Sequence, residues 1–254
     1  MNETLNIYYQ NKPFADWVRS HRFSGVTEHN IDKYLSVFQR YDMCQRQQCH
    51  DCVGLVPEWS TEIEIQSGIL KQTRCEKKKT QLNQNLKTKI PPLYKDANYT
   101  AFSEDIRKAV ETFINGFPKS KGLYIYSVKH NIGKTTLIWA IINKLLQEKK
   151  FNSDFVYNNI VDVAMAIHED AFENSHTTFK LYKECSLLAI DDFGDYNLTP
   201  TMIAKLRAIL DYRFAHNFPI IIVGSTPPET WAYEKSPMEG AMMKILRMTE
   251  AIGI

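Results

Sequence analysis

Residues 122–136 read Gly-Leu-Tyr-Ile-Tyr-Ser-Val-Lys-His-Asn-Ile-Gly-Lys-Thr-Thr. The stretch joins an apolar run, typical of a buried strand, to a Gly-Lys-Thr sequence that opens a helical pattern of apolar residues. A Gly-Lys-Thr at the start of a helix is suited to holding a triphosphate, because Gly133 lets the backbone come close and the first amides of the helix point at the phosphates. Lys134 can reach the β- and γ-phosphate oxygens, and Thr135 can place its hydroxyl on Mg²⁺. We therefore expect this stretch to bind ATP and Mg²⁺.

The loop departs from the usual spacing, Gly-x4-Gly-Lys-[Ser/Thr], which would place a first glycine at Val128. It reads as one residue longer, with Ser127 opening it and Asn131 tolerating the tight backbone that glycine would normally take. The residues that we expect around the phosphates are Ser127, His130, Asn131, Ile132, Gly133, Lys134, Thr135 and Thr136.

A second apolar run ends in two acids. Residues 186–194 read Ser-Leu-Leu-Ala-Ile-Asp-Asp-Phe-Gly, and Asp191 lies 57 residues after Lys134. The run predicts a buried parallel strand, next to the phosphate-loop strand, whose carboxylates emerge at its C-terminal end, where ligands bind in open α/β sheets. We expect Asp191 to act with Thr135 around the magnesium ion. Asp192 stands where vigorous ATPases carry the glutamate that orients the attacking water, so its shorter side chain predicts slow hydrolysis. The alternative is an ordinary strand end with two solvated acids.

A third apolar run, 218–224, is followed by Ser225, Thr226 and two prolines. If this strand neighbours the Asp191 strand, Ser225 or Thr226 would lie beside the γ-phosphate, where a small hydroxyl can sense or orient the attacking water. The alternative is a turn before the double proline.

Apolar periodicity predicts an α/β fold: a parallel sheet covered by helices on both faces, because strands and helices alternate along the chain. Strands are expected near 122–128, 155–159, 186–191 and 219–224, and helices near 134–149, 161–184, 200–216 and 237–250.

Composition is that of a soluble globular protein, with 44% hydrophobic and 24% charged residues in 254. The sequence contains no run of eighteen apolar residues, and its first residues lack the basic-then-apolar pattern of a signal peptide. We therefore expect a cytoplasmic protein. The net charge of +2 hides a basic stretch, 71–95, where eight Lys or Arg face the single acid Glu76.

Four of the five cysteines fall in the first third of the chain, at Cys44, Cys49, Cys52 and Cys75. In a reducing compartment such clustering favours zinc over disulfides, since four thiolates complete a closed tetrahedral site. Residues 61–75 alternate like a β-hairpin with Ser-Gly at its turn, which would carry Cys75 back to the Cys49-x2-Cys52 pair. His50 is a competing ligand, and buried free thiols are the alternative. Cys185 reads as a small core residue.

These patterns divide the chain into three parts. Helical periodicity over about 1–43 and the cysteine hairpin give a helical, zinc-binding domain over 1–79. Polar residues and a double proline predict a linker over 80–98. The alternating strands and helices give an ATPase domain over 99–254.

The Gly-Lys-Thr loop, the Asp191-Asp192-Phe193-Gly194 tetrapeptide and the sequence Arg213-x5-Pro219-Ile-Ile-Ile together resemble the DnaC/DnaI-type replicative helicase loaders, AAA+ P-loop ATPases of bacteria and their phages. The N-terminal cysteines and following segment look like the zinc-bearing, helicase-binding domain of the DnaI branch. The resemblance spans roughly residues 40–250.

The resemblance implies a weak, switch-like ATPase that binds the hexameric replicative DNA helicase and delivers it onto single-stranded DNA at replication initiation. It implies self-association in a spiral or ring, and it places Thr226 near the sensor-1 position. It also implies that 161–184 contributes to binding single-stranded DNA, through cations with interleaved aromatics. These residues are Phe172, His176, Phe179, Lys180, Tyr182 and Lys183. An amphipathic helix pair packed on the sheet is the alternative.

Near the C-terminus, members of this family carry a Ser-Arg-Leu element whose arginine reaches the γ-phosphate of the neighbouring subunit. The best register places Lys244 at that arginine, and Arg247 follows one helical turn later, so either could serve. Lysine lacks the planar fork that makes arginine effective against a transferring phosphate.

Two other functions stay open. One is a transposition-helper ATPase of the related IstB type, against which the cysteine cluster speaks. The other is a non-hydrolysing protein that captures a helicase. The missing loop glycine, Asp192 and Lys244 are compatible with it, because each departs from the motif of an active ATPase.

Overall fold

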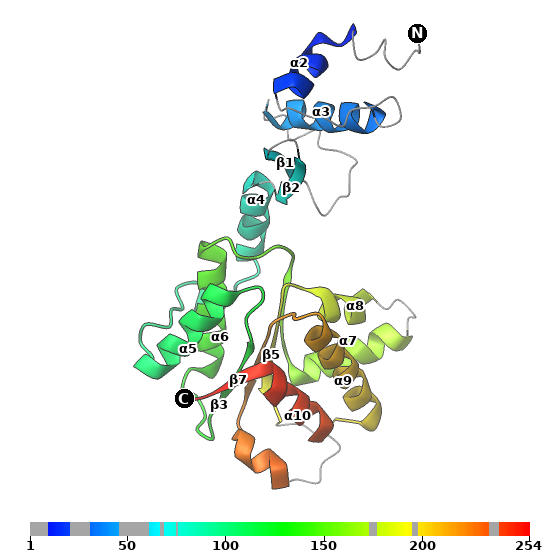
Figure 1. Cartoon of the computed structure of the whole chain (residues 1–254). Helices are drawn as coiled ribbons and strands as arrows, with labels where there is room; N and C mark the ends of the chain where they lie inside the picture. The colour runs from blue at the N-terminus through cyan, green and yellow to red at the C-terminus, as the bar shows by residue number, and fades with distance from the viewer. Residues whose placement is uncertain are drawn as a thin grey trace. The chain divides into compact units, whose positions relative to one another are not determined.

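The computed structural model of the protein describes residues 10–20, 31–45, 61–66, 69–74, 76–172, 177–194, 198–233 and 239–254 (Figure 1). The chain forms two compact units, Met1–Lys79 and Thr80–Ile254.

The smaller unit contains helices α2 (Lys12–Ser20) and α3 (Ile31–Gln45) and strands β1 (Thr61–Gln66) and β2 (Ile69–Arg74). The two helices share a small aromatic core, in which the rings of Phe14, Trp17 and Phe38 lie 5.4 to 6.0 Å apart. β1 and β2 pair antiparallel, with Gln66 opposite Ile69, so the predicted hairpin is confirmed.

The predicted zinc site stays a prediction, because most of its ligands are not described. Cys49, Cys52 and Cys75 lie outside the described residues, and Cys44 lies in the last turn of α3. Among the residues that the structure describes, no group of three or more His, Cys, Asp or Glu side chains could hold a metal ion.

The larger unit is built on a five-stranded parallel sheet with the order β4-β5-β6-β3-β7. Its strands are β3 (Gly122–Tyr126), β4 (Phe155–Asn159), β5 (Leu187–Phe193), β6 (Ile220–Gly224) and β7 (Thr249–Gly253). β6 lies between β3 and β5, so the expected direct pairing of the phosphate-loop strand with the Asp191 strand is wrong. The third apolar run occupies that place instead, which meets the condition set for Thr226.

Helices cover both faces of this sheet, as the alternation predicts. The helices of the larger unit are α4 (Glu76–Lys87), α5 (Glu104–Gly116), α6 (Lys134–Gln147), α7 (Ile160–Phe172), α8 (Thr177–Glu184), α9 (Pro200–Ala215) and α10 (Glu239–Met248), with short 3-10 turns at Pro92–Tyr94 and Pro228–Tyr233. α4 begins before the boundary between the units. No described helix is both long enough and apolar enough to cross a membrane.

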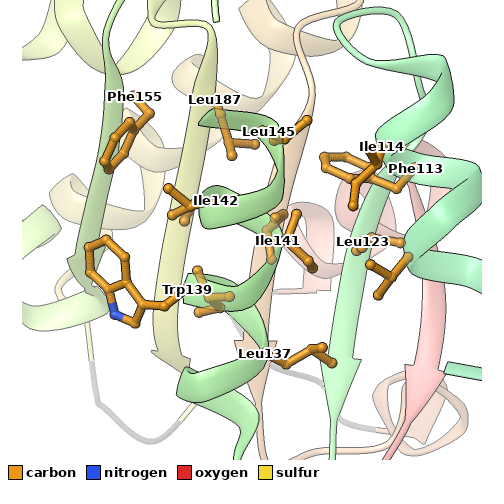
Figure 2. Packing of buried hydrophobic residues seen from close by; sticks show 14 of the residues in the cluster. Phe113, Ile114, Leu123, Leu137, Trp139, Ile141, Ile142, Leu145, Phe155 and Leu187 are labelled. Atoms are coloured by element: carbon orange, nitrogen blue, oxygen red, sulfur yellow. The ribbon is translucent and has the colours of Figure 1, made fainter. Parts of the chain in front are cut away.

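Alternate residues of each strand enter two separate cores, because successive side chains of a strand point to opposite faces. Leu123 and Ile125 of β3 pack with α5 and α6, whereas Tyr124 packs with α7, α9 and α10. Figure 2 shows the first core, in which Ile141 and Leu145 of α6 lie against the strands.

Two segments differ from the elements that the sequence predicts. The helix expected over 237–250 ends at Met248, and the following residues form β7, which pairs with β3. Part of the expected linker is the helix α4, and its Leu82 and Leu86, together with Ile90, pack on the core of the larger unit. These three recur every four residues, a helical spacing that the polar composition of 80–98 concealed.

Asn143 on α6 fixes the rest of the expected linker. Its side-chain amide donates to the carbonyls of Tyr94, Lys95 and Ala97 at 2.9, 3.2 and 3.0 Å. This turn is therefore part of the larger unit.

Candidate nucleotide-binding site

The phosphate loop lies between the end of β3 and the start of α6, as the sequence predicts. Gly133 is the residue before α6 and has a left-handed backbone with φ of 94°, which a side chain rarely adopts. A Cβ there would also lie 3.4 Å from the ring of Phe102. Asn131 has φ of 56°, so it takes the tight backbone expected of it. His130, Ile132 and Thr136 lie on the same loop and the first turn of α6.

Ser127 anchors the base of the loop. Its backbone N–H donates to the carbonyl of Gly224 on β6 at 3.2 Å, and its hydroxyl accepts from the N–H of Lys129 at 3.2 Å. The residue is only 7% exposed, so a small side chain is required at this position. This hydrogen bonding explains how a serine can open a loop that normally begins with glycine.

Lys134 folds back over the loop. Its ammonium donates to the carbonyls of Ser127 and Lys129 at 3.0 and 3.1 Å. The cation is thus held inside the curve of the loop, where phosphate oxygens could replace the two carbonyls as acceptors.

Asp191 joins the phosphate loop to β5. Its Oδ2 accepts a hydrogen bond of 2.7 Å from the Thr135 hydroxyl, and its Oδ1 accepts from the N–H of Asp192 at 3.0 Å. Asp191 is 3% exposed. A hydroxyl and a buried carboxylate in contact are hard oxygen donors of the kind that Mg²⁺ prefers, so these residues fit the ion expected here.

Asp192 takes a different orientation from Asp191. The pairing of β5 with β6 is irregular between Ile190 and Phe193, and Asp192 has φ of 55° and is exposed. Such irregularities re-aim side chains at strand ends. The two acids therefore separate, with Asp191 pointing into the protein and Asp192 toward solvent.

Thr226 lies beside this strand end. A Cβ on Gly194 would be 3.6 Å from the Thr226 hydroxyl, and the buried Tyr124 donates a 2.6 Å hydrogen bond to the Thr226 carbonyl. Thr226 therefore lies near the end of the Asp191 strand, as expected. Its role toward a γ-phosphate stays a prediction.

Tyr157 on β4 belongs to the site and was missed by sequence reasoning. Its hydroxyl donates to Oδ2 of Asp191 at 2.9 Å. Burial, and then the negative charge of Asp191, raise the pKa of Tyr157 far above its ordinary value, so the hydroxyl stays protonated. The two residues are 34 positions apart and lie on different strands, so no sequence motif predicts their contact.

The two candidates for a trans-acting cation differ in their surroundings. Lys244 on α10 forms a 2.8 Å ion pair with Asp211, and its ammonium lies 4.7 Å from the ring centre of Phe214. Arg247 lines a pocket of about 220 Å³ together with Lys119 and Lys121. Gly122 and Pro219, which begin or precede β3 and β6, line it too. The pocket therefore lies at the N-terminal ends of the strands, whereas the phosphate loop follows the C-terminal end of β3. Arg247 does not reach the nucleotide site of its own chain.

The segment expected to bind DNA, 161–184, contains both buried and exposed candidate residues. Tyr182 is 2% exposed and accepts a hydrogen bond from Asn158, so it is a core residue rather than a stacking platform. Lys183 lies over the ring of Phe179, 4.2 Å from its centre, and Lys180 is exposed. Phe172 ends α7, and His176 lies outside the described residues.

Comparison with known proteins gives matches among solved structures alone, since no family model and no curated protein matches the chain. The structure of the DnaC helicase loader is 19% identical, with a TM-score of 0.52, covering 65% of this chain and 99% of that chain. DnaI is 19% identical, with a TM-score of 0.52, covering 65% of this chain and 92% of that chain.

The replication initiator DnaA bound to AMPPCP and single-stranded DNA is 16% identical, with a TM-score of 0.53, covering 65% of this chain and 51% of that chain. All three matches cover the same share of this chain, which has a parallel five-stranded sheet with helices on both faces. The larger unit therefore has the AAA+ P-loop ATPase fold, the fold of the structures of DnaC, DnaI and DnaA.

Proposed function

We propose that this protein is an ATP-dependent loader that binds the hexameric replicative DNA helicase and delivers it onto single-stranded DNA. The observation that carries the proposal is the 2.7 Å hydrogen bond between Thr135 and Asp191. It joins the phosphate loop to a buried acid in a unit whose fold is similar to that of the DnaC helicase loader.

The nucleotide step follows from the residues of the loop. Lys134 exchanges its two carbonyl acceptors for phosphate oxygens, and the amides at the start of α6 bind the same phosphates. Thr135 and Asp191 would hold Mg²⁺, and the ion would neutralise part of the phosphate charge. Asp192 orients the attacking water, and its short side chain makes hydrolysis slow. ATP therefore acts as a switch for assembly and release.

In this proposal, the smaller unit binds the helicase. Its four cysteines, Cys44, Cys49, Cys52 and Cys75, bind zinc. The support is the hairpin: β2 ends at Arg74, directly before Cys75 in the sequence. A closed zinc site would stabilise a unit whose described residues share a small aromatic core.

Self-association places the nucleotide of one copy against the basic pocket of the next. Of the two candidate cations, Arg247 fits this role better, because Lys244 is already paired with Asp211. Such head-to-tail contacts build a spiral or a ring, depending on the rotation between copies.

DNA binding is assigned to the cations of α8. The exposed Lys180 and the half-buried Lys183 would attract the phosphate backbone of DNA, and Phe179 is the aromatic residue of that helix that is partly exposed. Tyr182 is left out of this surface because it is buried.

A loading assay tests the proposal. The cognate hexameric helicase is mixed with closed circular single-stranded DNA, with this protein and ATP, and helicase retained on the circle is measured after gel filtration. We expect retention to require both the protein and ATP. Equal retention without the protein, or with the protein in the absence of any nucleotide, would contradict an ATP-dependent loader.

A further inference from the structure

The buried carboxylate of Asp191 is surrounded by hydrogen-bond donors. Thr135, Tyr157 and the N–H of Asp192 all donate to it, at 2.7, 2.9 and 3.0 Å. A buried charge is costly unless donors surround it. However, the Thr135 hydroxyl is also expected to bind the metal ion, so its position changes with the ligand. Tyr157, by contrast, is a side-chain donor to Asp191 that is not expected to bind the metal ion or the nucleotide.

Packing fixes the position of Tyr157. β4 pairs in parallel with β5, so Tyr157 lies opposite Ala189 and on the same face of the sheet as Asp191. Its ring lies 4.6 Å from the ring of Trp139, which is 3% exposed. Trp139 in turn stacks on Tyr94, with ring centres 5.9 Å apart. The hydroxyl is therefore held by rigid aromatic packing.

We propose that Tyr157 is a positioning residue that holds the Asp191 carboxylate in the orientation in which Asp191 and Thr135 bind magnesium. The bond from Tyr157 reaches the same oxygen, Oδ2, that accepts from Thr135. It therefore sets the plane of the carboxylate relative to the Thr135 hydroxyl. Groups that orient metal-binding carboxylates from outside commonly affect metal affinity by about 10- to 100-fold.

The test is the Tyr157→Phe variant, and it rests on the nucleotide site proposed above. Phenylalanine keeps the ring beside Trp139 and removes only the hydroxyl. Binding of a fluorescent ATP analogue is measured in EDTA and across a magnesium titration. We expect the affinity in EDTA to be unchanged and the magnesium concentration at half-effect to rise roughly tenfold. A purely structural role would lower the melting temperature without moving that midpoint.

Tyr94→Phe is the matched control, since Tyr94 stacks on the same Trp139, whereas the tyrosine hydroxyl that donates to Asp191 is that of Tyr157. Its magnesium midpoint should equal that of the wild type. Tyr157→Met, which also fills the space beside Trp139, should repeat the shift of Tyr157→Phe. An unchanged midpoint in both Tyr157 variants, or an equal shift in Tyr94→Phe, overturns the inference. Failure of the wild type to bind the analogue at all would contradict the proposed function instead.

Discussion

At the scale of single residues, Lys134 decides whether the loop can hold a triphosphate. Its ammonium bonds two loop carbonyls and is positioned where phosphate oxygens would replace them. We expect Lys134→Ala to weaken ATP binding by about 3 kcal/mol, roughly a hundredfold, because a charge-assisted contact is lost. Isothermal titration with ATP and magnesium measures the change.

Lys108→Ala is a suitable control for that measurement, because Lys108 pairs with Glu104 on the exposed surface of α5. The control should bind ATP like the wild type. Equal affinity of the wild type and Lys134→Ala would overturn the assignment of the loop.

The sequence alone predicts this part of the site well, because Lys134, Thr135 and Asp191 act through local patterns: a loop before a helix, and an acid after a buried strand. Tyr157 could not be predicted, since its bond to Asp191 depends on how β4 pairs with β5. Similarly, the sequence register favours Lys244 at the position of the trans-acting arginine but leaves Arg247 as an alternative. Only the packing of α10 against α9 separates a paired lysine from an arginine in a pocket.

At the scale of elements, long runs of periodic apolar residues predict the strands of the sheet and the helices that cover it. Short or polar elements are not predicted. β7 has one buried apolar side chain, Ile252, and α4 is rich in lysine and glutamine. In both segments the tertiary contacts, rather than the local composition, decide the structure. The predicted core role of Cys185 is confirmed, because it is 2% exposed.

Arg213 explains the sequence pattern Arg213-x5-Pro219 at this scale. It is fully buried on α9, and its guanidinium donates to the carbonyls of Tyr182, Lys183, Cys185 and Pro219. The side chain thus ties α9 to the end of α8 and to the residues before β5 and β6. Burial lowers the pKa of Arg213 from its ordinary value, although these acceptors offset part of the cost.

We expect Arg213→Met to lower the free energy of unfolding by about 4 kcal/mol, because buried carbonyls would lose their donor. Urea denaturation followed by circular dichroism measures the change. Arg207→Met is the control on the same helix, since Arg207 is exposed, and it should change stability by less than about 0.5 kcal/mol. Identical urea midpoints for Arg213→Met and the control would show that this network does not stabilise the unit.

At the scale of the whole molecule, the zinc site should determine whether the smaller unit folds. We expect about one zinc per chain in protein purified from metal-replete cells. Removing it with a chelator should abolish helicase binding while ATP binding persists, because the larger unit has its own core. A zinc content below ~0.3 mol per mol would reject the ligand set of Cys44, Cys49, Cys52 and Cys75.

Assembly should depend on Arg247. We expect Arg247→Ala to reduce ATP turnover at least about tenfold in concentrated, self-associated protein, with ATP affinity unchanged, because the arginine acts on the neighbouring copy. Steady-state phosphate release and nucleotide titration separate the two effects. A larger loss in Lys244→Ala than in Arg247→Ala would assign the role to Lys244 instead.

The central claim is that ATP controls the capture of a replicative helicase, and native mass spectrometry of the protein mixed with the cognate hexameric helicase tests it most directly. We expect a stable complex of the hexamer with several copies of this chain in ATP. Without nucleotide, the complex should be weaker or contain fewer copies. No complex in either condition would contradict the loader function and favour a transposition-helper ATPase with a different partner.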